Sequence, residues 1–398
     1  MRLVRRSAAR QCKNVAGRTA EHSDGCLCER VKGWPVALRL EIDMSNNFLI
    51  YGANGYTGKL ILGMCQERGW RPVIAGRDAS KIETLARAFG FAERVFTLTD
   101  KKALDTGLQD IAVVLHCAGP FSRTSQPMVE GCLRNGVHYL DITGEIEVFE
   151  ALTVRHEEAK KAGVMVMPGV GFDVVPSDCL AAHLKRRLPT ATRLTLAFHG
   201  LGGISHGTAT TMVEKLGKGG AVRRDGKIVQ VPAAWKTREI DFGRGPVTAT
   251  TIPWGDVSTA FHTTGIPDIE VYSVIPAPIR RLMVASRYCG GLLASGPVQN
   301  FLKRRIDAQP AGPDLGQRER GATLLYGEAT DAAGQSVATR QSGPEGYKLT
   351  SLTALLIAQK VLAGNYQTGF QTPAKAYGSD LILEIEGVAR EDLSTRVT

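Results

Sequence analysis

Short apolar runs alternate with segments of helical periodicity through the first half of the chain. Runs such as 48–51, 72–76 and 111–116 are mostly apolar, and amphipathic stretches lie between them. Continuous apolar strands of this kind are typical of a parallel sheet whose two faces are both covered by helices. The pattern from residue 44 to Pro168 therefore predicts an α/β fold with a Rossmann-type, doubly wound parallel sheet.

The pattern also indicates where each element begins and ends. The expected strands of the first half are 48–51, 72–76, 94–98, 111–116, 137–141 and 164–168, and the expected helices are 59–65, 79–89, 101–108, 125–135 and 146–162. Beyond Pro168 the period changes. A helix at 177–188 and strands at 192–199, 248–252 and 269–274, with a loop at 309–314, predict a second domain of the α+β type with a mixed or antiparallel sheet.

Four segments follow from these patterns. Residues 44–175 form the expected NADP-binding Rossmann domain and 176–348 the expected α+β substrate domain, whose sheet would form a substrate wall or a homodimer face. Residues 349–398 contain a helix at 349–362 that would pack back on the first domain. Residues 1–43 are basic and lack strong periodicity. Because the first strand follows Met44 directly, we expect this extension to be disordered or untranslated, which N-terminal mass spectrometry would test.

Three glycines follow the first strand at a spacing of three residues, and a helical pattern comes next. Gly52 allows a tight turn, Gly55 lets the backbone approach a diphosphate, and Gly58 lets helix and strand pack closely. The strand–turn–helix context makes the stretch a dinucleotide fingerprint. The predicted cofactor contacts of this loop are Gly52, Ala53, Asn54, Gly55, Tyr56, Thr57 and Gly58.

The end of the second strand indicates which dinucleotide binds. Arg77 stands where an acidic residue would accept hydrogen bonds from a ribose 2′-hydroxyl, and arginine suits a 2′-phosphate instead. Lys81 adds a second positive charge. The sequence therefore predicts NADP(H), while Asp78, one residue later, leaves NAD(H) open. The turn after the fourth strand, Cys117-Ala118-Gly119-Pro120, should border the nicotinamide ribose because cofactors bind beyond the carboxyl ends of such strands.

A general acid is harder to choose. Tyr139, Asp173 and His206 are the candidates near the expected cleft, but each also has an ordinary structural reading as a packing residue, a helix cap or a loop histidine. No tyrosine is followed by lysine four residues later, which argues against the short-chain dehydrogenases. No histidine, cysteine and aspartate residues cluster at metal-ligand spacing, so no metal is expected.

Charge and cysteine content add constraints. The net charge is +10, and residues 1–43 supply nine basic against five acidic residues. So modest an excess is weak support for nucleic-acid binding, and no nucleic-acid partner is expected. The eight cysteines lack a Cys-x-x-Cys pair, as in a reduced cytoplasmic protein. Residues 276–306 carry six basic residues around apolar helical stretches, which predicts either ordinary amphipathic helices or peripheral contact with an anionic membrane.

Several motifs together resemble the saccharopine dehydrogenase-like oxidoreductases, especially the branch with the trans-acting enoyl reductases of lipid synthesis. They occur in order at 52–58, 75–77, 117–121, 138–145 and 171–178, and the similarity extends through 343–347 and 372–373 to about residue 386. The resemblance implies a nicotinamide-dependent oxidoreductase with a Rossmann domain and an α+β domain. One departure is Ser205-His206-Gly207-Thr208, where relatives tend to carry Ser-Gly-Gly-Thr.

Three functions stay open from the sequence. The favoured one is an NADPH-dependent reductase of a hydrophobic or lipid-linked enoyl or carbonyl substrate. A non-catalytic nucleotide-binding scaffold at a membrane surface is the second. True saccharopine metabolism is the third, and it needs cationic groups that converge on the substrate's carboxylates. Arg223, Arg224 and Lys227 are available for that purpose, but we expect them to form an exposed turn around Asp225-Gly226.

Overall fold

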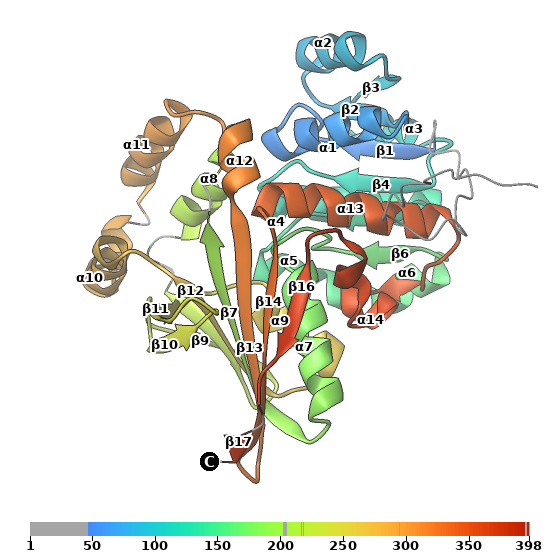
Figure 1. Ribbon diagram of the computed structural model, residues 1–398. Helices are drawn as coiled ribbons and strands as arrows, with labels where there is room; N and C mark the ends of the chain where they lie inside the picture. Colours follow the sequence, from blue (N-terminus) through green and yellow to red (C-terminus); the bar gives the residue numbers. More distant parts are fainter. Residues whose placement is uncertain are drawn as a thin grey trace, which may run out of the picture. The chain divides into compact units, whose positions relative to one another are not determined.

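The computed structural model describes residues 47–201, 205–215, 217, 219–293, 295–394 and 396–397 of the chain. The expectations for residues 1–43 lie outside this part of the chain. Two sheets organise the described residues, and each has its own hydrophobic core (Figure 1). The predicted α/β class, with a Rossmann-type sheet followed by a second mixed sheet, is confirmed.

The first sheet has seven parallel strands in the order β15-β6-β5-β4-β1-β2-β3. Their bounds are β1 (Phe48–Tyr51), β2 (Val73–Gly76), β3 (Glu93–Val95), β4 (Val113–His116), β5 (His138–Asp141), β6 (Met165–Met167) and β15 (Gly369–Phe370). The chain runs from β1 outward to β3 and then returns to β4 on the other side of β1. The carboxyl ends of β1 and β4 are therefore the switch point in strand order, where such sheets bind ligands.

Alternate residues of the strands face opposite layers of helices. In β1, Phe48 and Ile50 pack into one core with α1 (Tyr56–Glu67), α2 (Ala79–Phe89) and α13 (Gly346–Leu362). Leu49 and Tyr51 pack into the other core with α3 (Lys101–Gly107), α4 (Phe121–Asn135), α5 (Ile146–Thr153) and α6 (His156–Lys161). Burial on both faces explains why these strands are continuously apolar.

The C-terminal part of the chain completes the first sheet. Helix α13 packs into the core of β1 and α1, and β15 extends the sheet beside β6. The helix α14 (Pro373–Tyr377) and the short 3₁₀ helix η2 (Leu381–Glu384) follow and add to the same core. The domain around the first sheet is thus built from both ends of the described chain.

The second sheet is mixed, and α7 (Val175–Arg187) and α9 (Asp256–Thr264) cover one of its faces. Ten strands belong to it within the described residues, with the main order β10-β11-β12-β7-β13-β14-β16. They are β7 (Ala191–Leu201), β8 (Gly220–Arg224), β9 (Lys227–Val231), β10 (Thr237–Asp241), β11 (Pro246–Thr251), β12 (Asp268–Val274), β13 (Ala322–Asp331), β14 (Gln335–Pro344), β16 (Ala389–Asp392) and β17 (Arg396–Val397).

Several predicted bounds were wrong. The helix expected at 146–162 is broken into α5 and α6, because the β-branched pair Thr153-Val154 lies at the break and has low helix propensity. Helix α4 begins at Phe121, earlier than predicted, and the side chain of Glu145 caps its first turn. The strand expected at 94–98 ends at Val95. Of these errors, the start of α4 depends on a contact with a distant residue, which local periodicity does not encode.

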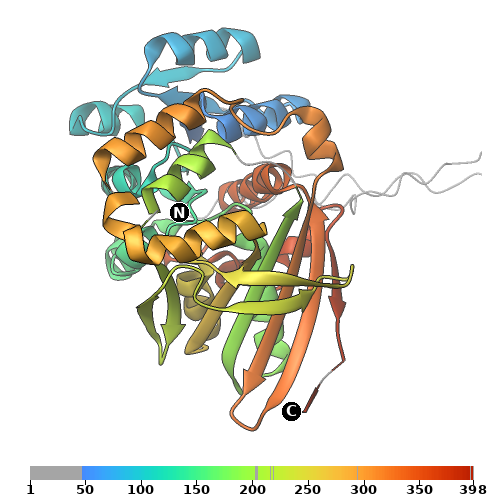
Figure 2. The same ribbon diagram turned by 90° about the vertical axis from the view of Figure 1, so that its left-hand side faces the viewer.

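Four further helices lie on one side of the second sheet, toward the viewer in Figure 2. They are α8 (His206–Lys215), α10 (Ala277–Leu293), α11 (Gly296–Asp307) and α12 (Leu315–Arg320). The loop predicted at 309–314 joins α11 to α12. Within the described residues, none of the helices combines the length and the apolar character that crossing a bilayer requires.

Candidate functional site

The glycine-rich turn after β1 has the geometry that the fingerprint predicts. Gly52 has a φ of +83°, and a Cβ there would lie 2.7 Å from the backbone nitrogen of Ala118. A Cβ on Gly58 would lie 2.7 Å from the carbonyl oxygen of Gly52. Side chains at these two positions would separate β1 from β4 or from α1, so the close packing requires glycine.

The N-terminus of α1 is open to an anion. Gly55 is its N-cap, with no side-chain hydrogen bond to the first turn, and the first turn holds no acidic residue. Its unpaired N–H groups and the positive end of the helix dipole favour a phosphate. The backbone of Gly55 to Thr57 is therefore suited to hold a diphosphate, and this contact stays a prediction.

Arg77 follows β2 directly and is exposed, and within the described residues its guanidinium has no ion pair or hydrogen bond. Asp78 is engaged instead. Its carboxylate caps α2 by accepting from the backbone N–H of Lys81 (3.3 Å), and it pairs with the ammonium of Lys81 (3.0 Å). Arg77 is thus the unpaired cation at the strand end. Asp78, the acidic residue that made NAD(H) binding possible in the sequence analysis, serves as a helix cap instead. This arrangement fits a 2′-phosphate.

The turn from Cys117 to Pro120 lies at the carboxyl end of β4, beside the dinucleotide loop. Ala118 packs on Gly52, and Gly119 is exposed. Burial raises the pKa of the Cys117 thiol well above its usual range, which favours the protonated thiol. The turn thus offers backbone and small apolar groups beside the dinucleotide loop, and its contact with the nicotinamide ribose stays a prediction.

A buried carboxylate supports this turn, and sequence reasoning assigned it no role. Glu145 accepts hydrogen bonds from the backbone N–H groups of Phe121 (2.9 Å) and Ser122 (3.2 Å), the first residues of α4. The N-terminus of α4 is therefore already neutralised by a side chain, in contrast to that of α1. Of these two helices that begin at the switch point, α1 is the one left open to an anion.

Tyr139 is in the core. It is fully buried in β5, and its hydroxyl donates to the Oδ2 atom of Asp141 at 2.6 Å. Asp141 also accepts from the N–H groups of Thr143 (2.9 Å) and Gly169 (2.8 Å). Burial raises the pKa of Asp141 to about 6, although these hydrogen bonds oppose the rise. The pair fixes the turns after β5 and β6, and Tyr139 has no surface to offer a substrate.

Asp173 lies at the same edge of the first sheet. It is half-buried, and a Cβ on Gly144, just after β5, would lie 2.7 Å from its Oδ2 atom. Its backbone carbonyl accepts from the indole N–H of Trp254 at 2.9 Å. The ring of Trp254 packs on Phe198 (5.5 Å between centroids), which in turn contacts Phe172 (5.8 Å). Asp173 is thus positioned between the cofactor edge and an aromatic cluster of the second domain.

His206 joins two segments of the second domain. Its Nε2 atom lies 2.7 Å from the carbonyl oxygen of Gln309, and its backbone N–H donates to the carbonyl of Ala311 (3.0 Å). The side chain is half-buried at the start of α8. The residue that departs from the family pattern therefore fastens α8 to the 309–314 loop.

Tyr347 is a residue of this site that sequence reasoning did not assign. Its ring meets the ring of Tyr56 edge-on at 5.0 Å, and its oxygen accepts the backbone N–H of Ser205 at 2.6 Å. The hydroxyl of Thr208 lies 3.0 Å away. Burial raises the pKa of Tyr347; the Ser205 and Thr208 hydrogen bonds oppose this rise, and the charge of Asp173 adds to it. The only sequence signal was its place in the glycine-rich 343–347 stretch.

The dinucleotide loop is tied to the segment around α12. The Tyr56 hydroxyl donates to the carbonyl of Pro313 (2.6 Å), and the Arg318 guanidinium donates to the Tyr56 hydroxyl (3.0 Å) and to the Pro313 carbonyl (2.8 Å). Gly312 lies against the Tyr56 ring, where a Cβ would approach within 2.7 Å. We call these contacts the Tyr56 tie. They hold the first residue of α1 against the second domain.

The prediction that residues 223–227 form an exposed turn is partly wrong. Asp225 and Gly226 do form the turn between β8 and β9, but Arg223 is only 3% exposed. Its guanidinium donates to the carbonyls of Val257 (2.7 Å) and Gly226 (2.6 Å) and pairs with Glu150 (3.0 Å). Arg224 pairs with Glu270. Both arginines are engaged in structural contacts, so they are not free to bind the carboxylates of a substrate.

Two more aspartates are buried where α7 and α9 begin, close enough to influence one another. Asp178 accepts the backbone N–H of Ala374 (2.8 Å) and the Thr263 hydroxyl (2.5 Å), yet burial raises its pKa to about 6. Asp256 is fully buried, and neither of its carboxylate oxygens has a well-formed hydrogen bond. Burial, with the charges of Asp178 and Asp173, raises the pKa of Asp256 well above its usual range.

We expect Asp256→Asn to change the pH dependence of stability. A carboxyl whose pKa is raised by folding holds its proton more tightly in the folded state, so stability is lost as the pH rises above about 4. Asparagine does not titrate. The variant should match the wild type near pH 4 and exceed it near pH 8 by on the order of 3 kcal/mol, the scale of an uncompensated buried charge. Urea unfolding across this range measures the difference.

Asp110→Asn, in an exposed turn, provides the control and should run parallel to the wild type at every pH. A difference in the free energy of unfolding between Asp256→Asn and the wild type that stays constant from pH 4 to pH 8 would contradict the prediction that Asp256 becomes a buried charge as the pH rises.

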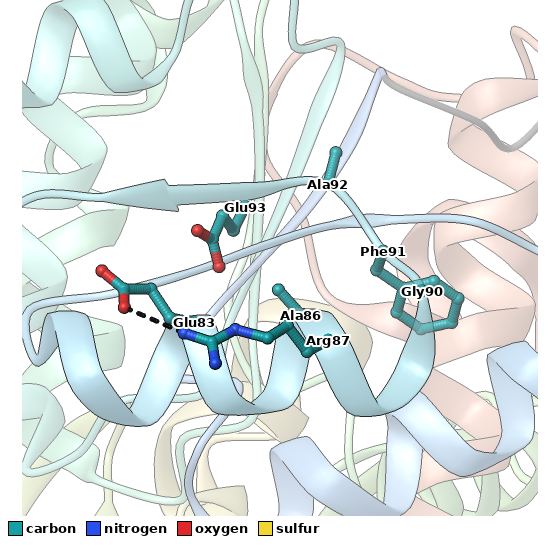
Figure 3. A pocket seen from close by; sticks show the side chains of 7 residues that line it. All are labelled: Glu83, Ala86, Arg87, Gly90, Phe91, Ala92 and Glu93. Atoms are coloured by element: carbon teal, nitrogen blue, oxygen red, sulfur yellow. Dashed lines mark ion pairs between the residues drawn. The ribbon is translucent and has the colours of Figure 1, made fainter.

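A shallow hollow at the far end of α2 is not part of the site (Figure 3). It lies where α2 ends and β3 begins, and therefore at the amino edge of the sheet, whereas the cofactor loop is at the carboxyl edge. Its lining residues are Glu83, Ala86, Arg87, Gly90, Phe91, Ala92 and Glu93. No group of histidine, cysteine and acidic residues suited to a metal ion occurs within the described ranges.

Comparison with known proteins agrees with this geometry. Residues 48–167 match the family model described as the saccharopine dehydrogenase NADP-binding domain. A Mycobacterium tuberculosis protein named provisionally as a trans-acting enoyl reductase is 27% identical over 414 residues, which cover 88% of this chain and 97% of that protein. The chain contains a saccharopine dehydrogenase NADP-binding domain. The resemblance stated from the motifs is confirmed, and the family model supports the preference for NADP(H).

Two further relatives agree with this placement. The rat saccharopine dehydrogenase-like oxidoreductase is 28% identical over 160 residues, 35% of this chain and 37% of its own length. Saccharopine dehydrogenase (L-Glu forming) from Saccharomyces cerevisiae is similar in fold, with a TM-score of 0.60, 13% identity, and coverage of 87% of this chain and 100% of that structure. The two-domain fold of this chain is thus similar to that of the yeast enzyme.

Proposed function

We propose that this oxidoreductase is an NADPH-dependent reductase of a hydrophobic or lipid-linked enoyl or carbonyl substrate. One observation carries the proposal: the two acid candidates, Asp173 and Tyr347, lie between the dinucleotide edge and the aromatic cluster of Phe172, Phe198 and Trp254. An apolar wall beside a proton donor suits an apolar substrate. The name of the Mycobacterium tuberculosis relative, which covers most of the chain, supports an enoyl group.

In this proposal, each residue of the site has a separate role in cofactor binding or proton transfer. When bound, NADPH supplies the hydride. Gly55 to Thr57 hold the diphosphate, and Arg77 pairs with the 2′-phosphate. Tyr347 donates the proton that completes the reduction. Its raised pKa keeps the phenol protonated at neutral pH, and the Ser205 N–H, which already points at the phenol oxygen, stabilises the phenolate that forms.

Turnover of the full chain tests the proposal. The purified protein is mixed with NADPH and a panel of α,β-unsaturated thioesters, long-chain ketones and long-chain aldehydes, and the loss of NADPH absorbance is followed. We expect consumption with NADPH to exceed that with NADH, and activity to rise with chain length. Tight NADPH binding without consumption of any member would instead favour the non-catalytic scaffold.

The Tyr56 tie should matter for cofactor affinity. Arg318→Ala removes the donor to the Tyr56 hydroxyl and to the Pro313 carbonyl, and it leaves the first residue of α1 less firmly held. We expect the Kd for NADPH to rise about tenfold, the scale of a lost charged hydrogen bond. Fluorescence titration with NADPH measures it.

Arg320→Ala, an exposed arginine of the same helix, is the matched control and should leave the Kd unchanged. Equal Kd values for the two variants would show that the tie is not coupled to the cofactor loop.

A further inference from the structure

Exposed apolar side chains are concentrated on α8, α10, α11 and α12. Tyr288 on α10 is 88% exposed, and Phe301 on α11 is 60% exposed. The others of this group are Met212, Ile279, Leu282, Val284 and Leu315. Both α10 and α11 lie toward the viewer in Figure 2, so the two helices occupy one side of the second domain. An accumulation of large exposed apolar residues on one side of a domain indicates an interaction surface.

The aromatic residues share helix faces with arginines. At 100° per residue, Arg281 and Tyr288 lie about 20° apart on one side of α10. The exposed Leu282 lies about 100° from Arg281, between that side and the buried Ser286. On α11, Phe301, Arg304 and Arg305 lie together, and all three are exposed. We call these six residues, Arg281, Leu282, Tyr288, Phe301, Arg304 and Arg305, the α10–α11 face. Each helix presents apolar and cationic side chains side by side.

The charge of this segment is entirely positive. Residues 276–306 contain six basic residues and no acidic one. Two of the six have structural partners: Lys303 pairs with Glu214 (2.7 Å), and Arg287 donates to the carbonyls of Ala233 (2.8 Å) and Ala234 (2.7 Å). Within the described residues, Arg281, Arg304 and Arg305 have no ion pair. These three guanidinium groups are available to an anionic partner.

We propose that the α10–α11 face docks the protein on an anionic lipid bilayer. A second copy of the chain would place unpaired arginines against each other, because the segment has no acid to meet them, and like charges repel. Amphipathic helices with aromatic and leucine side chains among arginines lie in the interface of anionic membranes, where the apolar groups enter the acyl boundary and the cations meet phosphates. This inference is independent of the reductase activity.

Vesicle co-sedimentation of the full chain tests the proposal. One set of vesicles is pure phosphatidylcholine and the other contains phosphatidylserine as well. We expect binding to the second set, weakened by added salt. The double variant Arg304→Glu/Arg305→Glu should lower the partition coefficient at least about tenfold, because each basic residue near such a surface contributes about a factor of five. Tyr288→Ser/Phe301→Ser should also lower the partition coefficient on the vesicles that contain phosphatidylserine.

Matched variants separate the face from general effects. Lys101→Glu/Lys102→Glu makes the same charge change on an exposed helix of the first domain, and Val95→Ser/Val154→Ser removes exposed apolar groups elsewhere. Both should bind vesicles like the wild type. NADPH titration of every variant checks that the fold is retained. Unchanged vesicle binding of both face variants would overturn the proposal, as would a dimer that light scattering shows to dissociate in Tyr288→Ser/Phe301→Ser. Retention on an acidic protein, without vesicle binding, would also overturn it.

Discussion

Arg77→Asp is expected to reverse the cofactor preference from NADPH to NADH. The wild-type guanidinium is exposed and unpaired at the end of β2, so it can form charge-assisted hydrogen bonds to the 2′-phosphate. Such bonds contribute about 1.5–3 kcal/mol, which corresponds to about 10- to 100-fold in affinity for NADPH. Aspartate removes them, repels the phosphate, and can accept hydrogen bonds from the free ribose hydroxyls of NADH.

Titration with each reduced dinucleotide measures both changes in one experiment. Arg71→Asp is the matched control, because Arg71 is exposed just before the amino end of the same strand and receives the same charge change. Its preference for NADPH should remain. Equal affinities of Arg77→Asp for the two dinucleotides, with NADPH binding as tight as in the wild type, would refute the assignment of the 2′-phosphate to this arginine.

The parts of the fold that local patterns encode were predicted well. Strands buried on both faces are continuously apolar, so β1, β2 and β4 stand out in the sequence, and a glycine in the left-handed region ends α4 at Gly136, where the pattern predicted its C-cap. The bounds of α2 agree as well, because Asp78 and Gly90 provide a clear start and stop. Elements whose limits depend on distant contacts, such as the start of α4, were predicted less accurately.

In the candidate site too, residues encoded by local patterns were predicted, and residues that depend on distant contacts were not. The dinucleotide loop and Arg77 lie in one strand–helix–strand unit, so spacing alone placed them. Tyr347 contacts Tyr56, Ser205 and Thr208, which come from two other parts of the chain, and nothing local distinguishes it from a packing tyrosine. The burial of Arg223 depends on Val257 and Glu150 in the same way. The roles of Tyr139, Asp173 and His206 in catalysis stay predictions, and the placement of Tyr139 in the core weakens its candidacy.

Tyr347→Phe is expected to lower kcat by at least about 100-fold while the Kd for NADPH stays close to that of the wild type, because general acid catalysis contributes about 10²–10⁴. The ring contact with Tyr56 is kept, and only the hydroxyl is lost. Single-turnover measurement of NADPH consumption with the best substrate of the panel separates chemistry from binding. Tyr366→Phe, at an exposed tyrosine whose ring contacts His138 at a tilted angle, is the matched control and should retain wild-type turnover.

The variant Asp173→Asn distinguishes whether Tyr347 or Asp173 donates the proton of the reduction. If Tyr347 donates the proton and the charge of Asp173 only raises its pKa, the asparagine variant should keep most of its turnover, and the alkaline limb of its pH–rate profile should move to lower pH. If Asp173 is itself the donor, kcat should fall by at least about 100-fold in Asp173→Asn and stay near the wild-type value in Tyr347→Phe. Full turnover in both variants would exclude each of them as the proton donor, and the proton would then come from a group outside this pair.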